Sequence, residues 1–192
     1  VPRWMKGSGK GWVTAEYSML PGSTHERIRR ERSKVGGRTQ EIQRLIGRSL
    51  RAVVDMEKLG ERMVTIDCDV LVADGGTRTT AISGAYVAME MVFNKLIKDG
   101  SLDSSPISEQ MGALSIGINA DGKIIADLNY EEDSSCHTDM NIVMTESGKF
   151  IEIQGTAEET PFSREQLNAI LECAEVSLKS VFTAQTAALE NA

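Results

Sequence analysis

Two helix-like segments in the first half of the chain each begin just after a pair of glycines. The glycine pairs are Gly36–Gly37 and Gly75–Gly76. Apolar residues then recur three or four positions apart, which is the spacing of one helical face. Residues 12–20 and the β-branched, alternating run 62–74 are instead typical of strands, and the second is predicted to be buried. A chain that switches between these two periods is restricted to folds in which helices pack against a sheet.

The helical patterns have predictable ends. The first runs from Thr39 and is expected to stop near Gly60, and the second is expected to stop at Gly100, where glycine can adopt the left-handed conformation. A long C-terminal helix is predicted from Ser163, which forms a capping box with Gln166.

Two hairpins are expected between the second and the last helix. The first joins residues 112–118 and 123–128 through an Asp-Gly turn, and the second joins 140–145 and 149–158. The order of elements predicts an α/β (α+β) fold with a mixed sheet and packed helices, and the length of 192 residues fits a single domain over residues 1–192.

Cysteine content and hydropathy bear on the compartment. The three cysteines are widely spaced and form no CxxC pair, which favours a reducing, cytoplasmic setting. No apolar run approaches the roughly 18 residues of a membrane span, so no membrane partner is expected.

The charge is unevenly distributed along the chain. The net charge of −7 disfavours a nucleic-acid partner, yet residues 25–51 contain nine basic and only three acidic side chains. Within this segment, residues 22–37 have few apolar side chains and are predicted to form an exposed loop. Its arginines are dense enough to contact a phosphate backbone, although a solvated basic face is the alternative. They are Arg27, Arg29, Arg30 and Arg32.

The stretch ADGGTRTT, residues 73–80, joins a strand to a helix through two glycines. Backbone N–H groups at a helix start favour an anion, and Thr77 and Arg78 add a hydroxyl and a fixed positive charge. The alternative is an ordinary turn in which Asp74 or Thr77 caps the helix. Arg38 follows the other glycine pair in the same way, so both arginines could surround one phosphate, unless the two helix starts are unrelated.

Carboxylates crowd the stretch DLNYEEDSSCHTDMN, residues 127–141, just before a strand. Two of them converging on one site would bind a divalent cation or act as an acid. Asp133 and Asp139 are the candidates, and an acidic surface loop is the alternative. His137 and Cys136 lie between them without a companion at metal-ligand spacing.

Five blocks carry a family resemblance. They are GWVTAEYSMLPGSTHERIRRE, GGRTQEIQRLIGRSLRAVVD, IDCDVLVADGGTRTTAISGA, YEEDSSCHTDMNIVMT and EIQGTAEETPFSREQL. In this order, across almost the whole chain, they resemble the bacterial ribonuclease PH family of phosphorolytic 3′ exoribonucleases. The chain resembles a form that begins a few dozen residues into the family sequence.

The resemblance implies a ribosomal protein S5 domain 2-like fold lacking its N-terminal strands. It implies that Arg38, Gly76, Thr77 and Arg78 bind inorganic phosphate, and that Asp133 and Asp139 are the catalytic carboxylates linked to Mg²⁺ and to protonation of the leaving group. It also implies that the arginine-rich loop guides tRNA precursors and other RNA 3′ ends, and that the chains form a homo-oligomer, a hexamer built as a trimer of dimers.

The function expected from the resemblance is phosphate-dependent 3′ to 5′ trimming of tRNA precursors, with release of nucleoside diphosphates and nucleotide addition in reverse. The other function considered is that of a non-catalytic, RNA-binding ring subunit of an exosome-like assembly. Retention of both aspartates and both arginines disfavours this second function.

Overall fold

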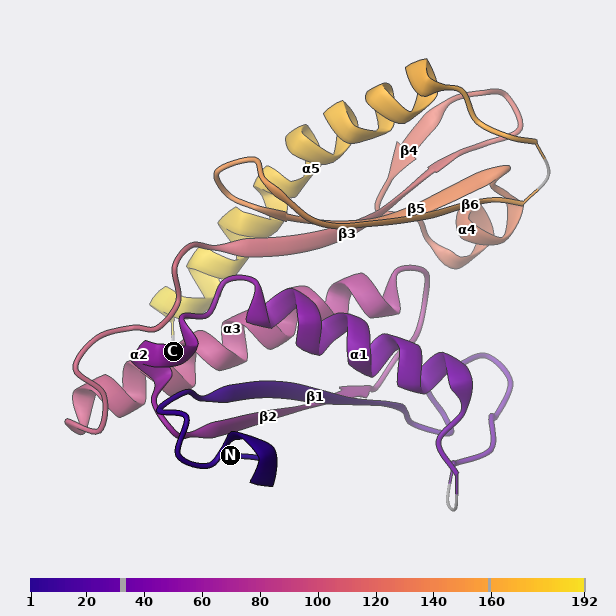
Figure 1. Cartoon of the computed structure of the whole chain (residues 1–192). Coiled ribbons are helices and arrows are strands. Elements are labelled where there is room, and N and C mark those ends of the chain that lie inside the picture. Colours follow the sequence, from indigo (N-terminus) through magenta and orange to yellow (C-terminus); the bar gives the residue numbers. More distant parts are fainter. Residues whose placement is uncertain (32–33, 159, 192) are drawn as a thin grey trace.

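The computed structural model describes residues 1–31, 34–158 and 160–191 (Figure 1). The chain forms two sheets with helices between and beside them (Figure 1). The elements in chain order are η1 (Arg3–Met5), β1 (Trp12–Met19), α1 (Gly37–Arg51), α2 (Met56–Leu59), β2 (Met63–Val70), α3 (Thr77–Lys98), β3 (Met111–Ile118), β4 (Ile124–Ala126), α4 (Tyr130–Ser135), β5 (Thr138–Thr145), β6 (Phe150–Ala157) and α5 (Arg164–Glu190).

Strands β1 and β2 form a parallel two-stranded sheet in which Trp12 pairs with Met63 and Met19 with Val70. Helix α1 makes the crossover between them, and α1 and α3 both lie on the same side of this sheet (Figure 1). The prediction that the second strand is buried is wrong, because Ile66 is the only β2 residue with less than a tenth of its surface exposed. Covering one face leaves every second side chain of β2 facing outward.

The first helix ends earlier than its apolar pattern predicts. Helix α1 stops at Arg51, and Asp55 begins the separate short helix α2 by accepting hydrogen bonds from the backbone N–H groups of Glu57 and Lys58. Val54, between the two helices, forms an isolated bridge with Ile107. The apolar spacing continued past Arg51 because Val53 and Val54 are buried in this connection.

The four-stranded sheet is antiparallel, in the order β4-β3-β5-β6, and contains both predicted hairpins. Every residue of β3 is buried because α3 packs on one face of the strand and α5 on the other. Gly112 lies under α5, where an added Cβ would meet Val181 and Phe182 at 3.1–3.2 Å. The layers are therefore the parallel sheet, helices α1 and α3, the antiparallel sheet and α5 (Figure 1).

The ends of α3 and α5 agree with the sequence. Gly100, just after α3, has a φ of +77°, and the capping box of Ser163 and Gln166 begins α5. Helix α4 was not predicted from the sequence. Its first turn carries Glu131, Glu132 and Asp133 of the stretch 127–141, and a capping box formed by Asn129 and Glu132 begins the helix. The α/β fold class is confirmed, with the parallel and antiparallel pairings in two separate sheets.

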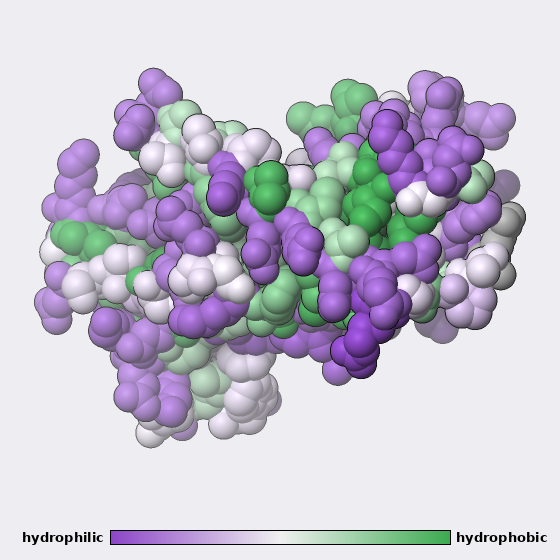
Figure 2. Space-filling view, turned by 90° about the horizontal axis from the view of Figure 1, so that it is seen from above, coloured by the Kyte–Doolittle hydropathy of each residue, from purple (hydrophilic) through white to green (hydrophobic). Residues whose placement is uncertain are grey.

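The face of the molecule that Figure 2 shows is mainly polar. Seen from above, hydrophilic residues cover most of the molecule, and hydrophobic residues gather toward the right, over the region of the four-stranded sheet (Figure 2). Its edge strand β6 carries two exposed large hydrophobic side chains, Phe150 and Ile153. Across the part of the chain that the structure describes, no helix is both long enough and apolar enough to cross a membrane.

Candidate active site

The turn between β2 and α3 presents an uncapped helix start. Gly76 is the N-cap residue of α3, with a φ of +66°, and because it is a glycine it makes no side-chain cap to the first N–H groups of the helix. Asp74 accepts a hydrogen bond from the Tyr130 N–H at 2.7 Å, and Thr77 accepts one from the Tyr17 hydroxyl at 2.9 Å. The alternative that Asp74 or Thr77 caps this helix is therefore wrong, and the positive end of the α3 dipole is available to an anion.

Glycine is required in this turn for a second reason. A Cβ on Gly75 would lie 2.0 Å from the carbonyl oxygen of Leu128, in the chain that leads from β4 into α4. The turn thus lies directly against the segment that carries Asp133, and this contact brings the start of α3 close to the carboxylates.

The second glycine pair starts α1 in a similar way. Gly36 is the N-cap residue, again without a side-chain cap, and Arg38 is the second residue of the helix. The Arg38 side chain is exposed, and its Nη1 contacts the Met19 sulfur at 3.9 Å.

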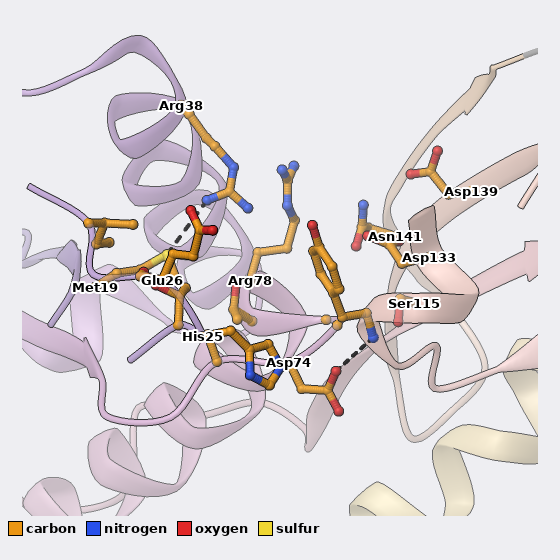
Figure 3. A pocket seen from close by; sticks show the side chains of 17 residues that line it. Met19, His25, Glu26, Arg38, Asp74, Arg78, Ser115, Asp133, Asp139 and Asn141 are labelled. Atoms are coloured by element: carbon orange, nitrogen blue, oxygen red, sulfur yellow. Dashed lines mark hydrogen bonds between the residues drawn. The ribbon is translucent and has the colours of Figure 1, made fainter. Parts of the chain in front are cut away.

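These segments meet in one pocket of about 440 Å³ (Figure 3). The sequence-predicted residues that line it are Arg38, Gly76, Thr77, Arg78, Asp133 and Asp139. The first four come from the α1 and α3 starts, and the two aspartates come from α4 and β5. The structure therefore brings together all of the predicted phosphate-binding and carboxylate residues.

The two aspartates differ in their surroundings. Asp133 is exposed on α4, whereas Asp139 is half-buried on β5. Burial, and then the negative charges of Asp133 and Glu158, raise the pKa of the Asp139 carboxyl, while the positive charge of Arg78 lowers it. The environment of Asp139 thus lets its carboxyl keep a proton at a higher pH than an ordinary aspartate does.

Asp133 and Asp139 are also a candidate metal site. Within the described ranges, no group of three or more His, Cys, Asp or Glu side chains could hold a metal ion. Two hard carboxylates in a pocket still fit Mg²⁺, which takes one or two protein carboxylates and fills its other positions with water and substrate phosphate oxygens.

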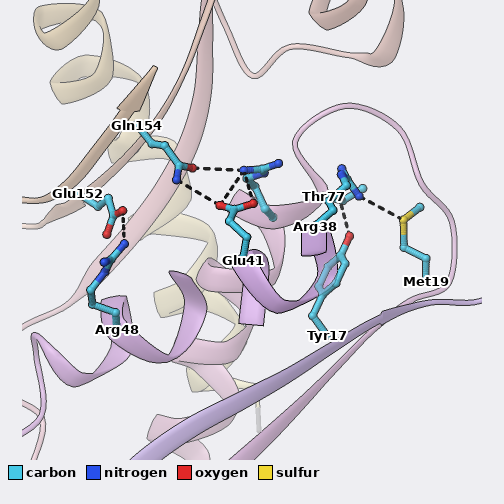
Figure 4. A network of polar contacts seen from close by, with 9 residues as sticks. Tyr17, Met19, Arg38, Glu41, Arg48, Thr77, Glu152 and Gln154 are labelled. Atoms are coloured by element: carbon cyan, nitrogen blue, oxygen red, sulfur yellow. Dashed lines mark hydrogen bonds and ion pairs between the residues drawn. The ribbon is translucent and has the colours of Figure 1, made fainter. Parts of the chain in front are cut away.

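Several residues of the site were not predicted from the sequence. Glu41 and Gln154 bind the Arg78 guanidinium (Figure 4), and Tyr17 binds Thr77. Ser115 lines the pocket as a buried hydroxyl that has no hydrogen-bond partner among the residues that the structure describes. Glu41 lies three positions after Arg38, so helical spacing offered a signal for it. The other three residues lie on strands that are distant from one another in sequence, and the sequence contains no signal that would have predicted them.

The basic segment begins at the rim of the pocket. Thr24, His25, Glu26 and Ile28 line the pocket, and the neighbouring Arg27, Arg29 and Arg30 are exposed in a loop without helix or strand. Arg32, predicted with them as an RNA-binding residue, lies outside the described residues.

Models of one protein family match both halves of the chain. Residues 1–92 match domain 1 of the 3′ exoribonuclease family, and residues 110–177 match domain 2. The chain belongs to the 3′ exoribonuclease family. Two matched segments together cover most of its length, and the pocket is formed by residues of both.

Curated relatives in this family are similar over nearly the whole chain. Ribonuclease PH of Bacillus pumilus is 57% identical over 97% of this chain and 78% of its own length. Ribonuclease PH of Bacillus subtilis is 57% identical over 96% of this chain and 76% of its own, and that of Crocosphaera subtropica is 56% identical over 100% and 80%. This similarity supports a phosphorolytic 3′ exoribonuclease, a nucleotidyltransferase with inorganic phosphate as co-substrate, over a non-catalytic ring subunit.

Two solved structures have the same fold at much lower sequence identity. Rice (Oryza sativa) Rrp46 superposes with a TM-score of 0.73 at 16% identity, covering 95% of this chain and 75% of its own. The Archaeoglobus fulgidus exosome, solved with RNA bound to the active site, has a chain that superposes with a TM-score of 0.71 at 17% identity, covering 91% of this chain and 72% of its own. These matches agree with the S5 domain 2-like fold expected from the sequence.

Proposed function

We propose that the pocket between α1, α3, α4 and β5 is the phosphorolytic active site and that inorganic phosphate binds on its α1–α3 side. Arg38, Arg78, Thr77 and the backbone N–H groups after Gly76 would hold the phosphate. The observation that carries this proposal is that two uncapped, arginine-bearing helix starts and two carboxylates line one pocket. Arginine suits the task because its planar fork pairs with two phosphate oxygens.

The bound phosphate would attack the phosphorus of the last 3′ phosphodiester. A bond forms from a phosphate oxygen to that phosphorus, the bond from phosphorus to the neighbouring 3′ oxygen breaks, and a nucleoside diphosphate leaves. The 3′ oxygen of the shortened RNA takes up a proton. This reaction depends on positioning and charge neutralisation, which the arginines and backbone N–H groups provide without a covalent nucleophile.

We assign the proton to Asp139, because its raised pKa and its place in the pocket fit a general acid. Asp133 would be the carboxylate that holds Mg²⁺, with Asp139 as a second ligand when it is ionised. The ion would neutralise negative charge on the phosphoryl oxygens.

The RNA backbone would be contacted, as the 3′ end enters the pocket, by the arginines of the basic loop. They are Arg27, Arg29, Arg30 and Arg32. The proposed substrates are tRNA precursors and other RNA 3′ ends in the cytoplasm. RNA binding should then weaken as salt rises, because each phosphate contact releases counterions.

A hexamer built as a trimer of dimers is the assembly we propose. A single domain over residues 1–192 is part of the same proposal, supported by the packing of α3 against strands of both sheets. A mass measurement by light scattering, at the concentration used in the assay, tests the hexamer.

A crossed pair of variants tests the residue assignments. Arg78→Ala should raise the KM for phosphate about tenfold or more, since a charge-assisted hydrogen bond contributes roughly 1.5–3 kcal/mol, and should leave the KM for RNA nearly unchanged. Arg29→Ala should instead raise the KM for RNA and leave the KM for phosphate nearly unchanged. Equal effects of both variants on both substrates would contradict the separation of a phosphate site from an RNA-binding loop.

A further inference from the structure

One side of the Arg78 guanidinium is held by two other side chains (Figure 4). Its Nη1 donates to both carboxylate oxygens of Glu41 at 3.2 Å and to the Gln154 Oε1 at 3.2 Å. Gln154 in turn donates from its Nε2 to the Glu41 Oε1 at 3.1 Å. Three elements, α3, α1 and β6, therefore meet in a closed triangle of polar contacts.

This triangle uses only one nitrogen of the guanidinium. Arginine has five N–H donors in a fixed plane, and among the described residues the hydrogen bonds of Arg78 involve only those of Nη1. Because the plane is rigid, fixing Nη1 also fixes the directions of the donors on Nη2 and Nε. The Arg78 side chain is 22% exposed and lines the pocket, so these remaining donors are the ones a bound anion can use.

Arg38 lies on the same pocket under a different constraint. Its contact is with the Met19 sulfur, a weak acceptor, at 3.9 Å. Within the described part of the chain the two arginines therefore differ, because a carboxylate and an amide orient Arg78 whereas neither kind of group contacts Arg38.

We propose that Glu41 and Gln154 are positioning residues that orient Arg78 for phosphate. This inference rests on the proposed function, in which Arg78 binds the attacking phosphate. An arginine held in the binding orientation loses less conformational entropy when the anion arrives. Because Gln154 lies on β6 and Arg78 on α3, the phosphate site would reach its full affinity only when the two halves of the chain are packed together.

A second link at the same boundary provides a matched control. Arg48 and Glu152 form an ion pair between α1 and β6 (Figure 4). Arg48 lies seven positions after Glu41, two helical turns along the same face, and Glu152 lies two positions before Gln154, on the same face of its strand. The pair joins the same two elements without touching Arg78, so its loss reports what a purely structural contact contributes.

The sign of the effect separates positioning from charge. Removing the negative charge of Glu41 would by itself strengthen the binding of an anion nearby. If orientation of Arg78 is the larger effect, Glu41→Gln weakens phosphate binding instead. Glu41→Asp keeps the charge and shortens the reach, and it should weaken phosphate binding as well.

The experiment is a set of initial-rate measurements with phosphate and an RNA 3′ end varied separately. Glu41→Gln, Glu41→Asp and Gln154→Met should each raise the KM for phosphate, about tenfold for Glu41→Gln, with kcat at saturating phosphate and the KM for RNA within about twofold of the parent. Glu152→Gln should change none of these values. Thermal unfolding of each variant verifies that the fold is retained.

Arg78→Lys is measured in the same series. A raised phosphate KM in Arg78→Lys with an unchanged or lowered one in Glu41→Gln would overturn the positioning role while keeping the phosphate site. Equal rises in Glu41→Gln and Glu152→Gln would also overturn it, since both would then act through the α1–β6 contact. An unchanged phosphate KM in Arg78→Lys would overturn the positioning role, since a charge without an oriented fork would then suffice. An unchanged phosphate KM in Arg78→Ala would overturn the proposed phosphate site itself, and the positioning role with it.

Discussion

Gly75 occupies the tightest backbone contact of the site, against the Leu128 carbonyl oxygen. Gly75→Ala places a Cβ 2.0 Å from that oxygen, so the turn or the start of α4 must move. We predict a loss of about 2 kcal/mol or more in the free energy of unfolding, with a loss of activity. Gly84→Ala, in the exposed interior of α3 with nothing within 4 Å of the added Cβ, should instead stabilise by about 0.5–1 kcal/mol. Urea unfolding of both variants tests the contrast.

Asp139 is predicted to lower stability while serving catalysis. Folding raises the pKa of the Asp139 carboxyl, so the ionised carboxylate is less favourable in the folded state than in the unfolded state. The ionised Asp139 therefore destabilises the folded state at neutral pH. The penalty fades as pH falls toward the unfolded-state pKa of about 3.9. Asp139→Asn should therefore be more stable than the parent at pH 7, by a margin that shrinks toward pH 4, and should lose phosphorolysis. Unfolding with a chelator present keeps metal binding out of the comparison, and a less stable Asp139→Asn at pH 7 would contradict the prediction.

At the scale of elements, α5 is attached to the four-stranded sheet by a narrow apolar stripe. Ile170 is fully buried in it, whereas Val176, on the same helix, is 68% exposed. Ile170→Ala should cost about 2–5 kcal/mol through lost burial and the cavity left behind. Val176→Ala should change stability by no more than about 0.5 kcal/mol. Denaturant midpoints measure both, and similar costs would mean that α5 packs through a different face.

The elements that the sequence predicted are those whose ends carry a local signal. The capping box at Ser163 and the stop at Gly100 were both correct. The end of α1 at Arg51 was missed because the apolar pattern continues into a buried turn, and α4 was missed because six residues are too short for a periodic pattern. The partial exposure of β2 depends on which face the helices cover, and its residues alone do not determine this.

The same limit applies to the pocket. Arg38, Arg78 and the glycine turn were predicted because helix starts have a recognisable sequence, and the aspartates because carboxylates cluster. Gln154 lies 113 positions from its partner Glu41, so only the packing of β6 against α1 brings them together. Its role could not be predicted from the sequence.

At the scale of the whole molecule, the pocket depends on both halves of the chain. Helix α3 packs against β2 in the first sheet and against β3 in the second, which couples the two sheets through one element. We predict a single cooperative unfolding transition. Both tryptophans, Trp4 and Trp12, lie in the first half, so their fluorescence reports that half while circular dichroism reports the whole chain. Coincident midpoints are expected, and a fluorescence transition separate from the circular dichroism transition would mean that the halves unfold independently.

In the proposed reaction, free inorganic phosphate is the nucleophile. The most direct measurement supplies radiolabelled inorganic phosphate with an unlabelled RNA 3′ end and identifies the released nucleotide by chromatography. We predict that the released nucleotides are labelled nucleoside diphosphates, and that the rate of RNA shortening falls to background when phosphate is withheld. Unlabelled nucleoside monophosphates, released equally fast with and without phosphate, would show that water is the nucleophile and would contradict the claim.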